Sequence, residues 1–270
     1  MWTAIIALLL LLLSQGLSLI ATLVIMLMRT GRELSSLSPS ALLQNEPDAS
    51  LFGTCNLFFT LLLIWLLCST RLTAPRPLRA FAQGMPARWV WSIVAFMLLS
   101  FGLSLTLHPF AIEDEVVTRT FLSMKDNVWC VLLIVLAGPV SEELIFRACI
   151  VRVLRPSGRF IAILYSALAF AVVHGNLMQG IPAFFMGIAL ALLYLHTGDV
   201  RLCLPAHVCN NLVGYLQMRF CPDSEWLDAS PAWLPVSAGM ALIVAGSALL
   251  CVFLLRGNSE PSSQSPLRNA

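Results

Sequence analysis

Three charged residues, Glu142, Glu143 and Arg147, lie close together inside an otherwise apolar stretch from Val128 to Leu154. A charge at the centre of a membrane span costs about 2.5–3.5 kcal/mol on insertion scales, so a cluster of charges there predicts a functional site. Glu143 and Arg147 are four positions apart, and on a helix they share a face and can form an ion pair. Glu142 points about 100° away around the helix. It has no cation nearby in the sequence, and this leaves it free to act as a general base.

Two later apolar segments supply candidate partners for this carboxylate. His174 follows Phe170 by four positions, and His207 precedes Asn211 by four positions, so each pair shares a helix face. Glu142 and His174 could polarise a water molecule, and His207 and Asn211 could donate hydrogen bonds to a developing oxyanion. This set predicts an amide hydrolase inside a membrane.

Two other interpretations of the same residues stay open. Glu142, His174 and His207 could instead hold zinc, because two histidines and one carboxylate match a catalytic zinc site with one open position. The sequence has no HExxH helix to support that choice. The Glu143–Arg147 pair could also be purely structural and hold helices together.

Composition places the chain in a membrane. Of its 270 residues, 59% are hydrophobic and only 11% are charged, and the mean hydropathy is +0.86. Soluble domains are about a quarter charged, so this is a polytopic membrane protein. A net charge of +2 gives no indication of nucleic-acid binding. The eight cysteines show no CxxC pattern and are expected to be small apolar residues rather than a disulfide framework.

The apolar runs predict an all-α transmembrane bundle of about eight spans. The expected spans are 2–28, 51–69, 89–107, 128–154, 159–174, 181–196, 202–218 and 233–255. We expect one structural domain. It comprises N-terminal spans and a partly helical linker (1–127), a catalytic core (128–218), a last loop and span (219–255) and a disordered tail (256–270). The first run lacks a basic flank, so it is interpreted as a retained span rather than a signal peptide.

The distribution of arginines predicts the orientation. The loop 71–88 and the segment 152–159 carry the most arginines, and basic loops stay on the cytoplasmic side. With about eight spans, both termini are then cytoplasmic. We expect a multi-pass protein of the cell (inner) membrane that contacts membrane lipids.

The three motifs, in their order and spacing, resemble the CPBP family of CAAX-protease and bacteriocin-processing (Abi-like) intramembrane proteases. The motifs are Glu-Glu-x-x-x-Arg at 142–147, Phe-x-x-x-His at 170–174 and His-x-x-x-Asn at 207–211. The resemblance covers about 128–215 and implies an intramembrane endopeptidase for a membrane-associated or lipidated peptide or protein.

The resemblance also implies a role for each motif residue. Glu142 would activate the water and His174 would assist. His207 and Asn211 would stabilise the oxyanion, while Glu143 and Arg147 would orient the site. The family is described both as metalloproteases and as glutamate-dependent enzymes, so zinc stays open as a cofactor.

Two non-enzymatic alternatives also fit a charged cluster in a membrane. One is an immunity or scaffolding protein that keeps the cluster for packing. The other is a small transporter, although transporters usually show repeat symmetry and none is visible here.

The predicted depths of the candidate residues raise a geometric difficulty. Counting along straight helices puts His174 near the outer end of its span and His207 in the inner half of another. A shared site therefore requires a tilted or re-entrant segment.

Overall fold

The computed structural model describes residues 2–30, 46–70, 72–73, 86–87, 89–110, 115–220 and 229–257. All regular secondary structure in this part of the chain is helical, which confirms the all-α prediction. Most of the predicted loops 29–50, 71–88 and 219–232 and of the predicted disordered tail 256–270 lies outside the described residues.

Each predicted span forms a helix, and most extend a few residues beyond the apolar run. The single helices are α1 (Trp2–Thr30), α3 (Glu46–Ser69), α4 (Trp89–Leu107), α9 (Arg159–Val172), α10 (Leu177–Thr197), α11 (Val200–Phe220) and α13 (Trp233–Gly257). The 108–127 linker contains the short helix η3 (His108–Phe110) and the helix α5 (Glu115–Met124). The predicted start of the sixth span at Ile181 was four residues late, because Asn176 caps α10 by accepting a hydrogen bond from the Gln179 N–H.

Six helical segments within the described residues are long and apolar enough to cross a membrane. The two other predicted spans do not meet this criterion. Helix α9 has only 14 residues, and α11 is interrupted by polar side chains such as Asn210 and Asn211. The chain is therefore an integral membrane protein by length and composition, and the count of about eight spans is approximate.

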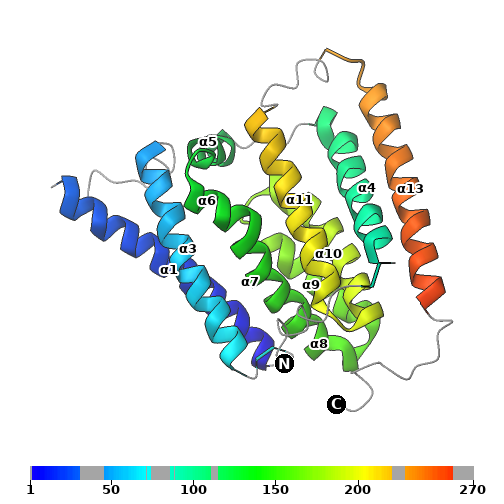
Figure 1. Cartoon of the computed structure of the whole chain (residues 1–270), viewed down its shortest axis with the longest axis horizontal. Helices are drawn as coiled ribbons and strands as arrows, with labels where there is room; N and C mark the ends of the chain where they lie inside the picture. Colours follow the sequence, from blue (N-terminus) through cyan, green and yellow to red (C-terminus); the bar gives the residue numbers. More distant parts are fainter. Residues whose placement is uncertain are drawn as a thin grey trace.

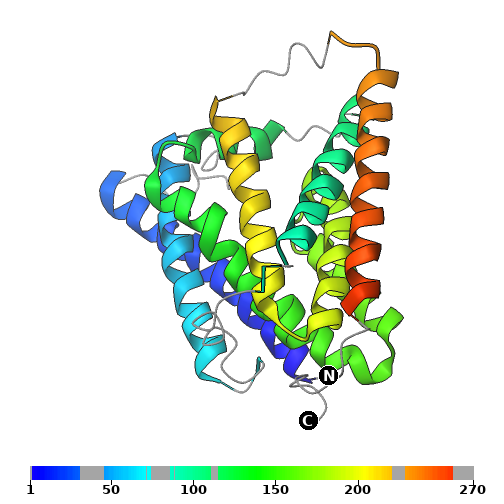
Figure 2. The same ribbon diagram turned by 45° about the vertical axis from the view of Figure 1, so that its right-hand side comes forward.

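The helices form a bundle with a central group between two outer pairs (Figures 1 and 2). Helices α1 and α3 pack together on one side, and α4 and α13 pack together on the other. Between them lie α9, α10, α11 and the segment that carries the glutamates (Figure 1). The buried hydrophobic core is continuous through this centre.

Glycines bring α4 and α13 into very close contact. A Cβ atom added at Gly102 would lie 2.7 Å from the Gly239 carbonyl oxygen, and one added at Gly239 would lie 2.5 Å from the Gly102 carbonyl oxygen. Small residues allow such close backbone approach between membrane helices. Helix α13 therefore fixes the position of α4, whose other face borders the candidate site.

The glutamate-bearing segment is a helix with two widened turns. Regular helix α6 (Val128–Leu132) leads into the π-helix η4 (Leu133–Ala137) and then α7 (Gly138–Ile145). A second π-helix, η5 (Phe146–Val151), is followed by the short α8 (Arg152–Leu154) and the 3-10 turn η6 (Arg155–Ser157). Single π-helical turns occur frequently at functional sites. Here they flank the turn that carries Glu142 and Glu143.

Pro139 leaves one backbone carbonyl of η4, that of Ile134, without an N–H donor from its own helix. The Gly138 N–H donates to the Leu133 carbonyl, five residues back. In that register the next donor would be Pro139, which has no N–H. The Ile134 carbonyl therefore needs a partner from another helix, and Asn211 supplies it.

Candidate active site

The predicted ion pair is present and fully enclosed. Glu143 Oε1 lies 3.1 Å from Arg147 Nη1, and the two side chains are 1% and 0% exposed. The guanidinium carbon of Arg147 lies 4.6 Å from the centre of the Phe170 ring, within the range of a cation–π interaction. Arg147 Nη2 also donates to the Gly187 carbonyl at 3.5 Å. The Arg147 guanidinium therefore contacts groups of three other segments: Glu143 of α7, Phe170 of α9 and Gly187 of α10.

His207 lies between the two glutamates. Its Nδ1 donates to Glu143 Oε1 at 2.8 Å, and its Nε2 lies 3.6 Å from Glu142 Oε2. Because Glu143 accepts at Nδ1, the reactive position of the ring is Nε2, which faces Glu142. Sequence reasoning did not foresee the bond to Glu143, because contacts between distant helices depend on tertiary packing.

Glu142 differs from Glu143 in accessibility. Its side chain is 24% exposed, against 1% for Glu143. Glu143 is committed to Arg147 and His207, whereas the one ionic contact that the described residues give Glu142 is the longer one to His207. A separation of 3.6 Å is too long for a good hydrogen bond. Glu142 is therefore the more accessible of the two carboxylates and has no close hydrogen-bond partner within the described residues.

Phe170 connects the two histidines. Its ring centre lies 5.0 Å from that of His174 and 5.7 Å from that of His207, and both contacts are edge-to-face. The depth difficulty is thereby resolved, since α9 is short and both imidazoles pack against one ring. Sequence reasoning named Phe170 as a motif residue on the same face as His174 but did not predict its contact with His207.

A tight turn holds His174 in place. His174 Nδ1 donates to the Phe170 carbonyl at 2.7 Å. A carbonyl can only accept, so in the neutral ring Nε2 keeps its lone pair. The next residue, Gly175, has a φ of 70°, a left-handed conformation that favours glycine. Asn176 Nδ2 donates to the His174 carbonyl at 2.8 Å. His174 thus presents Nε2 as a fixed acceptor.

The side-chain amide of Asn211 has two N–H bonds, and the described residues accept a hydrogen bond from one of them. Its Nδ2 donates to the free Ile134 carbonyl at 3.0 Å, which leaves the second hydrogen of the amide. Its Oδ1 accepts from Asn210 Nδ2 at 3.4 Å. Asn210 in turn accepts a short hydrogen bond from Ser100 of α4. Sequence reasoning missed Ser100 and gave Asn210 no role, although the Asn-Asn pair on an apolar helix was a visible signal.

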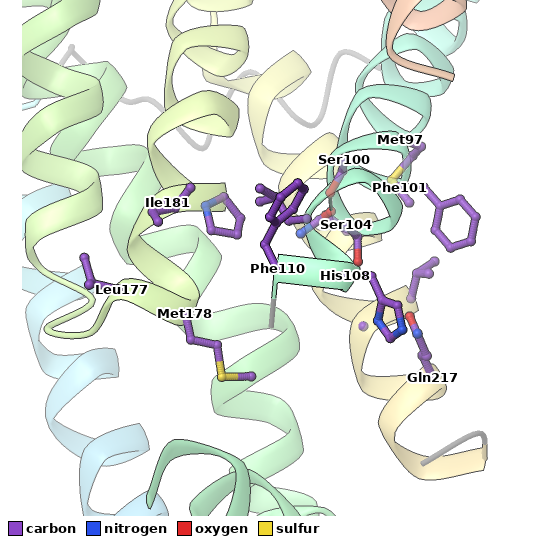
Figure 3. Close-up of a pocket in the computed structure, with 15 residues that line it drawn as sticks. Met97, Ser100, Phe101, Ser104, His108, Phe110, Leu177, Met178, Ile181 and Gln217 are labelled. Carbon is purple, nitrogen blue, oxygen red and sulfur yellow. Dashed lines mark hydrogen bonds between the residues drawn. The ribbon is translucent and has the colours of Figure 1, made fainter. Parts of the chain in front are cut away.

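A cavity of about 480 Å³ opens beside this hydrogen-bonded group. Figure 3 shows Ser100 and Ser104 of α4 on one side and Leu177, Met178 and Ile181 of α10 on the other. Asn210, Gly214 and Gln217 of α11 and the short helix η3 also line it. The lining is mostly apolar with a few polar groups, as is typical of ligand sites.

The geometry gives no support to the zinc alternative. In the part of the chain that the structure describes, no group of three or more His, Cys, Asp or Glu side chains could hold a metal ion. His207 and His174 each donate at Nδ1 and keep Nε2 as the nitrogen that a metal could bind. Zinc held by Glu142, His174 and His207 gains no support from the arrangement of the described residues, and the reaction proposed below uses protein groups and water.

The fold and the site define a class: a polytopic α-helical membrane protein with a largely buried carboxylate–imidazole centre and a cavity that is lined in part by Asn210, the neighbour of Asn211. Residues 124–213, a third of the chain, match the family model described as Type II CAAX prenyl endopeptidase Rce1-like. The match confirms the resemblance indicated by the three motifs and supports an intramembrane endopeptidase of the CAAX-protease type. The comparisons with curated proteins and with solved structures gave no match.

Proposed function

We propose that the protein hydrolyses a peptide bond of a membrane-associated or lipidated substrate, with Glu142 as the general base. The observation that carries the proposal is that the two glutamates differ in burial and in their contacts. Glu143 is enclosed by Arg147 and His207, while Glu142 is accessible and faces the free nitrogen of the same imidazole. The test is cleavage of a peptide by the reconstituted protein and by the Glu142→Gln variant.

The proposed reaction begins at a water molecule between Glu142 and His174. The Glu142 carboxylate takes a proton from the water, and the water oxygen forms a bond to the carbonyl carbon of the substrate. Nε2 of His174 accepts a hydrogen bond from the same water and orients it. Glu142 then returns the proton to the leaving nitrogen as the C–N bond breaks, which yields a carboxylic acid and an amine.

The negative charge that develops on the carbonyl oxygen of the substrate must be stabilised by hydrogen-bond donors. Asn211 offers its second amide hydrogen. His207, in its imidazolium form, donates at Nε2 while Nδ1 stays bonded to Glu143. Donors already fixed before the reaction contribute several kcal/mol to catalysis in a site shielded from bulk water. Arg147 acts indirectly, because it holds Glu143 and thereby the orientation of His207.

The cavity beside Asn210 is the proposed entrance for the substrate. Its apolar walls suit hydrophobic side chains or a lipid group, and its serines, asparagine and glutamine suit an extended peptide backbone. The family match favours a peptide ending in a prenylated CAAX sequence as the first probe. Membrane lipids surround the exposed apolar faces of the bundle, and both termini are proposed to be cytoplasmic in the cell (inner) membrane.

A side chain added at Gly214 should impair substrate binding. Gly214 lines the cavity, and a Cβ atom built there meets nothing within 4 Å. The side chain of Gly214→Leu therefore begins in open space at the cavity wall and takes up part of the cavity. We expect KM for a farnesylated, internally quenched CAAX peptide to rise about tenfold, with kcat nearly unchanged, because binding rather than chemistry is disturbed. Initial rates in detergent over a range of peptide concentrations measure this effect.

Gly16→Leu is the matched control. Gly16 lies on α1, and a Cβ atom there also meets nothing within 4 Å. This variant should keep the wild-type KM. Equal KM values for Gly214→Leu and Gly16→Leu would show that the substrate does not use this cavity.

A further inference from the structure

We infer that Asn210 is a positioning residue that orients the Asn211 amide, and that Ser100 of α4 anchors Asn210. The inference rests on the proposed function, because Asn211 acts there as an oxyanion donor. Asn210 and Ser100 would be two additional members of the site, and Ser100 lies outside the segment 124–213 that matches the family.

A continuous chain of hydrogen bonds carries this inference. The Ser100 hydroxyl donates to Asn210 Oδ1, Asn210 Nδ2 donates to Asn211 Oδ1, and Asn211 Nδ2 donates to the Ile134 carbonyl. Each amide uses its oxygen on one side and its nitrogen on the other. The side-chain oxygen of Asn210 can only accept, so the Ser100 hydroxyl is the donor of the first bond. This bond keeps the Asn210 oxygen toward Ser100 and the Asn210 nitrogen toward Asn211. The plane of the Asn211 amide is therefore held at both ends.

The location of these side chains argues against a merely structural bond. Ser100 and Asn210 are only partly buried, and both line the cavity proposed for the substrate. Figure 3 shows Ser100 on its wall. A polar pair used only to hold α4 against α11 would not need to lie on the cavity wall. At this position the pair lies next to the path proposed for the substrate and is linked, through Asn210, to the residue that stabilises the oxyanion.

The effect should appear in kcat. An oxyanion donor acts in the transition state, and a misplacement of about 1 Å can cost about 100-fold in rate. Asn210→Asp keeps the oxygen that accepts from Ser100 and removes the N–H that donates to Asn211. We expect this variant to lower kcat about 10–100-fold with little change in KM. Ser100→Ala should have a smaller effect of the same kind, and Ser100→Thr, which keeps the hydroxyl, should restore the rate.

The decisive test is a double-mutant cycle with cleavage of the farnesylated CAAX peptide as readout. If Asn210 acts through Asn211, then Asn210→Asp should cost little further in kcat when Asn211 is already alanine. Ser92→Ala is the control, because Ser92 is a buried serine of the same helix whose one hydroxyl hydrogen bond among the described residues goes to Trp89 of its own helix. Thermal unfolding of each variant identifies losses that come from misfolding.

Three outcomes are distinguishable. Non-additive loss in the cycle together with rescue by Ser100→Thr supports the inference. Additive losses, or an Asn210→Asp enzyme with wild-type kcat, overturn it while the peptidase proposal stands. If Glu142→Gln, measured in the same assay, cleaves as fast as the wild type, the proposed function itself fails and the inference falls with it.

Discussion

Glu142→Gln should reduce peptide cleavage about 10²–10⁴-fold, the range usual for loss of a general base. The amide of glutamine has nearly the same shape as the carboxylate but cannot take a proton from water. Folding should be preserved, because the Glu142 side chain is 24% exposed and the enclosed ion pair of the site does not include it. The measurement is kcat for the farnesylated CAAX peptide with the purified protein in liposomes.

Glu115→Gln is the control for this result. Glu115 is an exposed carboxylate of α5 that pairs with Arg119, four positions on. It should leave kcat at the wild-type value. Cleavage by Glu142→Gln at a rate close to that of Glu115→Gln would favour the non-enzymatic interpretations, an immunity or scaffolding role or a transporter.

Arg147→Met should destabilise the protein by about 3–5 kcal/mol, the usual cost of removing one partner from a buried ion pair. Methionine approximates the length of the arginine stem but leaves the Glu143 carboxylate enclosed, with only His207 as a partner. Activity should fall as well, because His207 loses the fixed acceptor that orients it. The midpoint of thermal unfolding and kcat are measured on the same preparation.

The chain contains a matched comparison for this substitution. Glu115 and Arg119 form another pair with the same spacing, but their side chains are 76% and 59% exposed. Arg119→Met should change the free energy of unfolding by no more than about 0.5 kcal/mol, as is usual for exposed helical pairs. Similar stabilities of Arg147→Met and Arg119→Met would mean that the pair at 143 and 147 does not organise the site.

The sequence predicted the features that depend on local periodicity. Long apolar runs located the helices, and the spacing of four placed Glu143 beside Arg147 because residues four apart share one face of a helix. The order of the three motifs indicated the family that residues 124–213 match. The positions of the predicted spans were correct to within a few residues, except at the start of α3 and α10.

The remaining features required the packed structure. The π-helical turns around Glu142 and Glu143 do not follow from hydrophobic periodicity, because segments of 5 and 6 residues are too short to reveal a change of period. The bond from His207 to Glu143 and the packing of both histidines against Phe170 join helices that are distant in the sequence. Ser100 escaped notice because a single serine in an apolar helix usually bonds to its own backbone, whereas this one bonds to Asn210 of α11.

Cleavage in water enriched with ¹⁸O tests the central claim most directly. Wild-type protein and the Glu142→Gln variant are incubated with the farnesylated CAAX peptide, and the masses of the products are measured by mass spectrometry. Attack by water activated at Glu142 predicts two peptide fragments from the wild type, with one ¹⁸O atom in the new carboxyl group, and only trace product from the variant. Labelled product formed equally fast by the variant would contradict the assignment of Glu142 as the base.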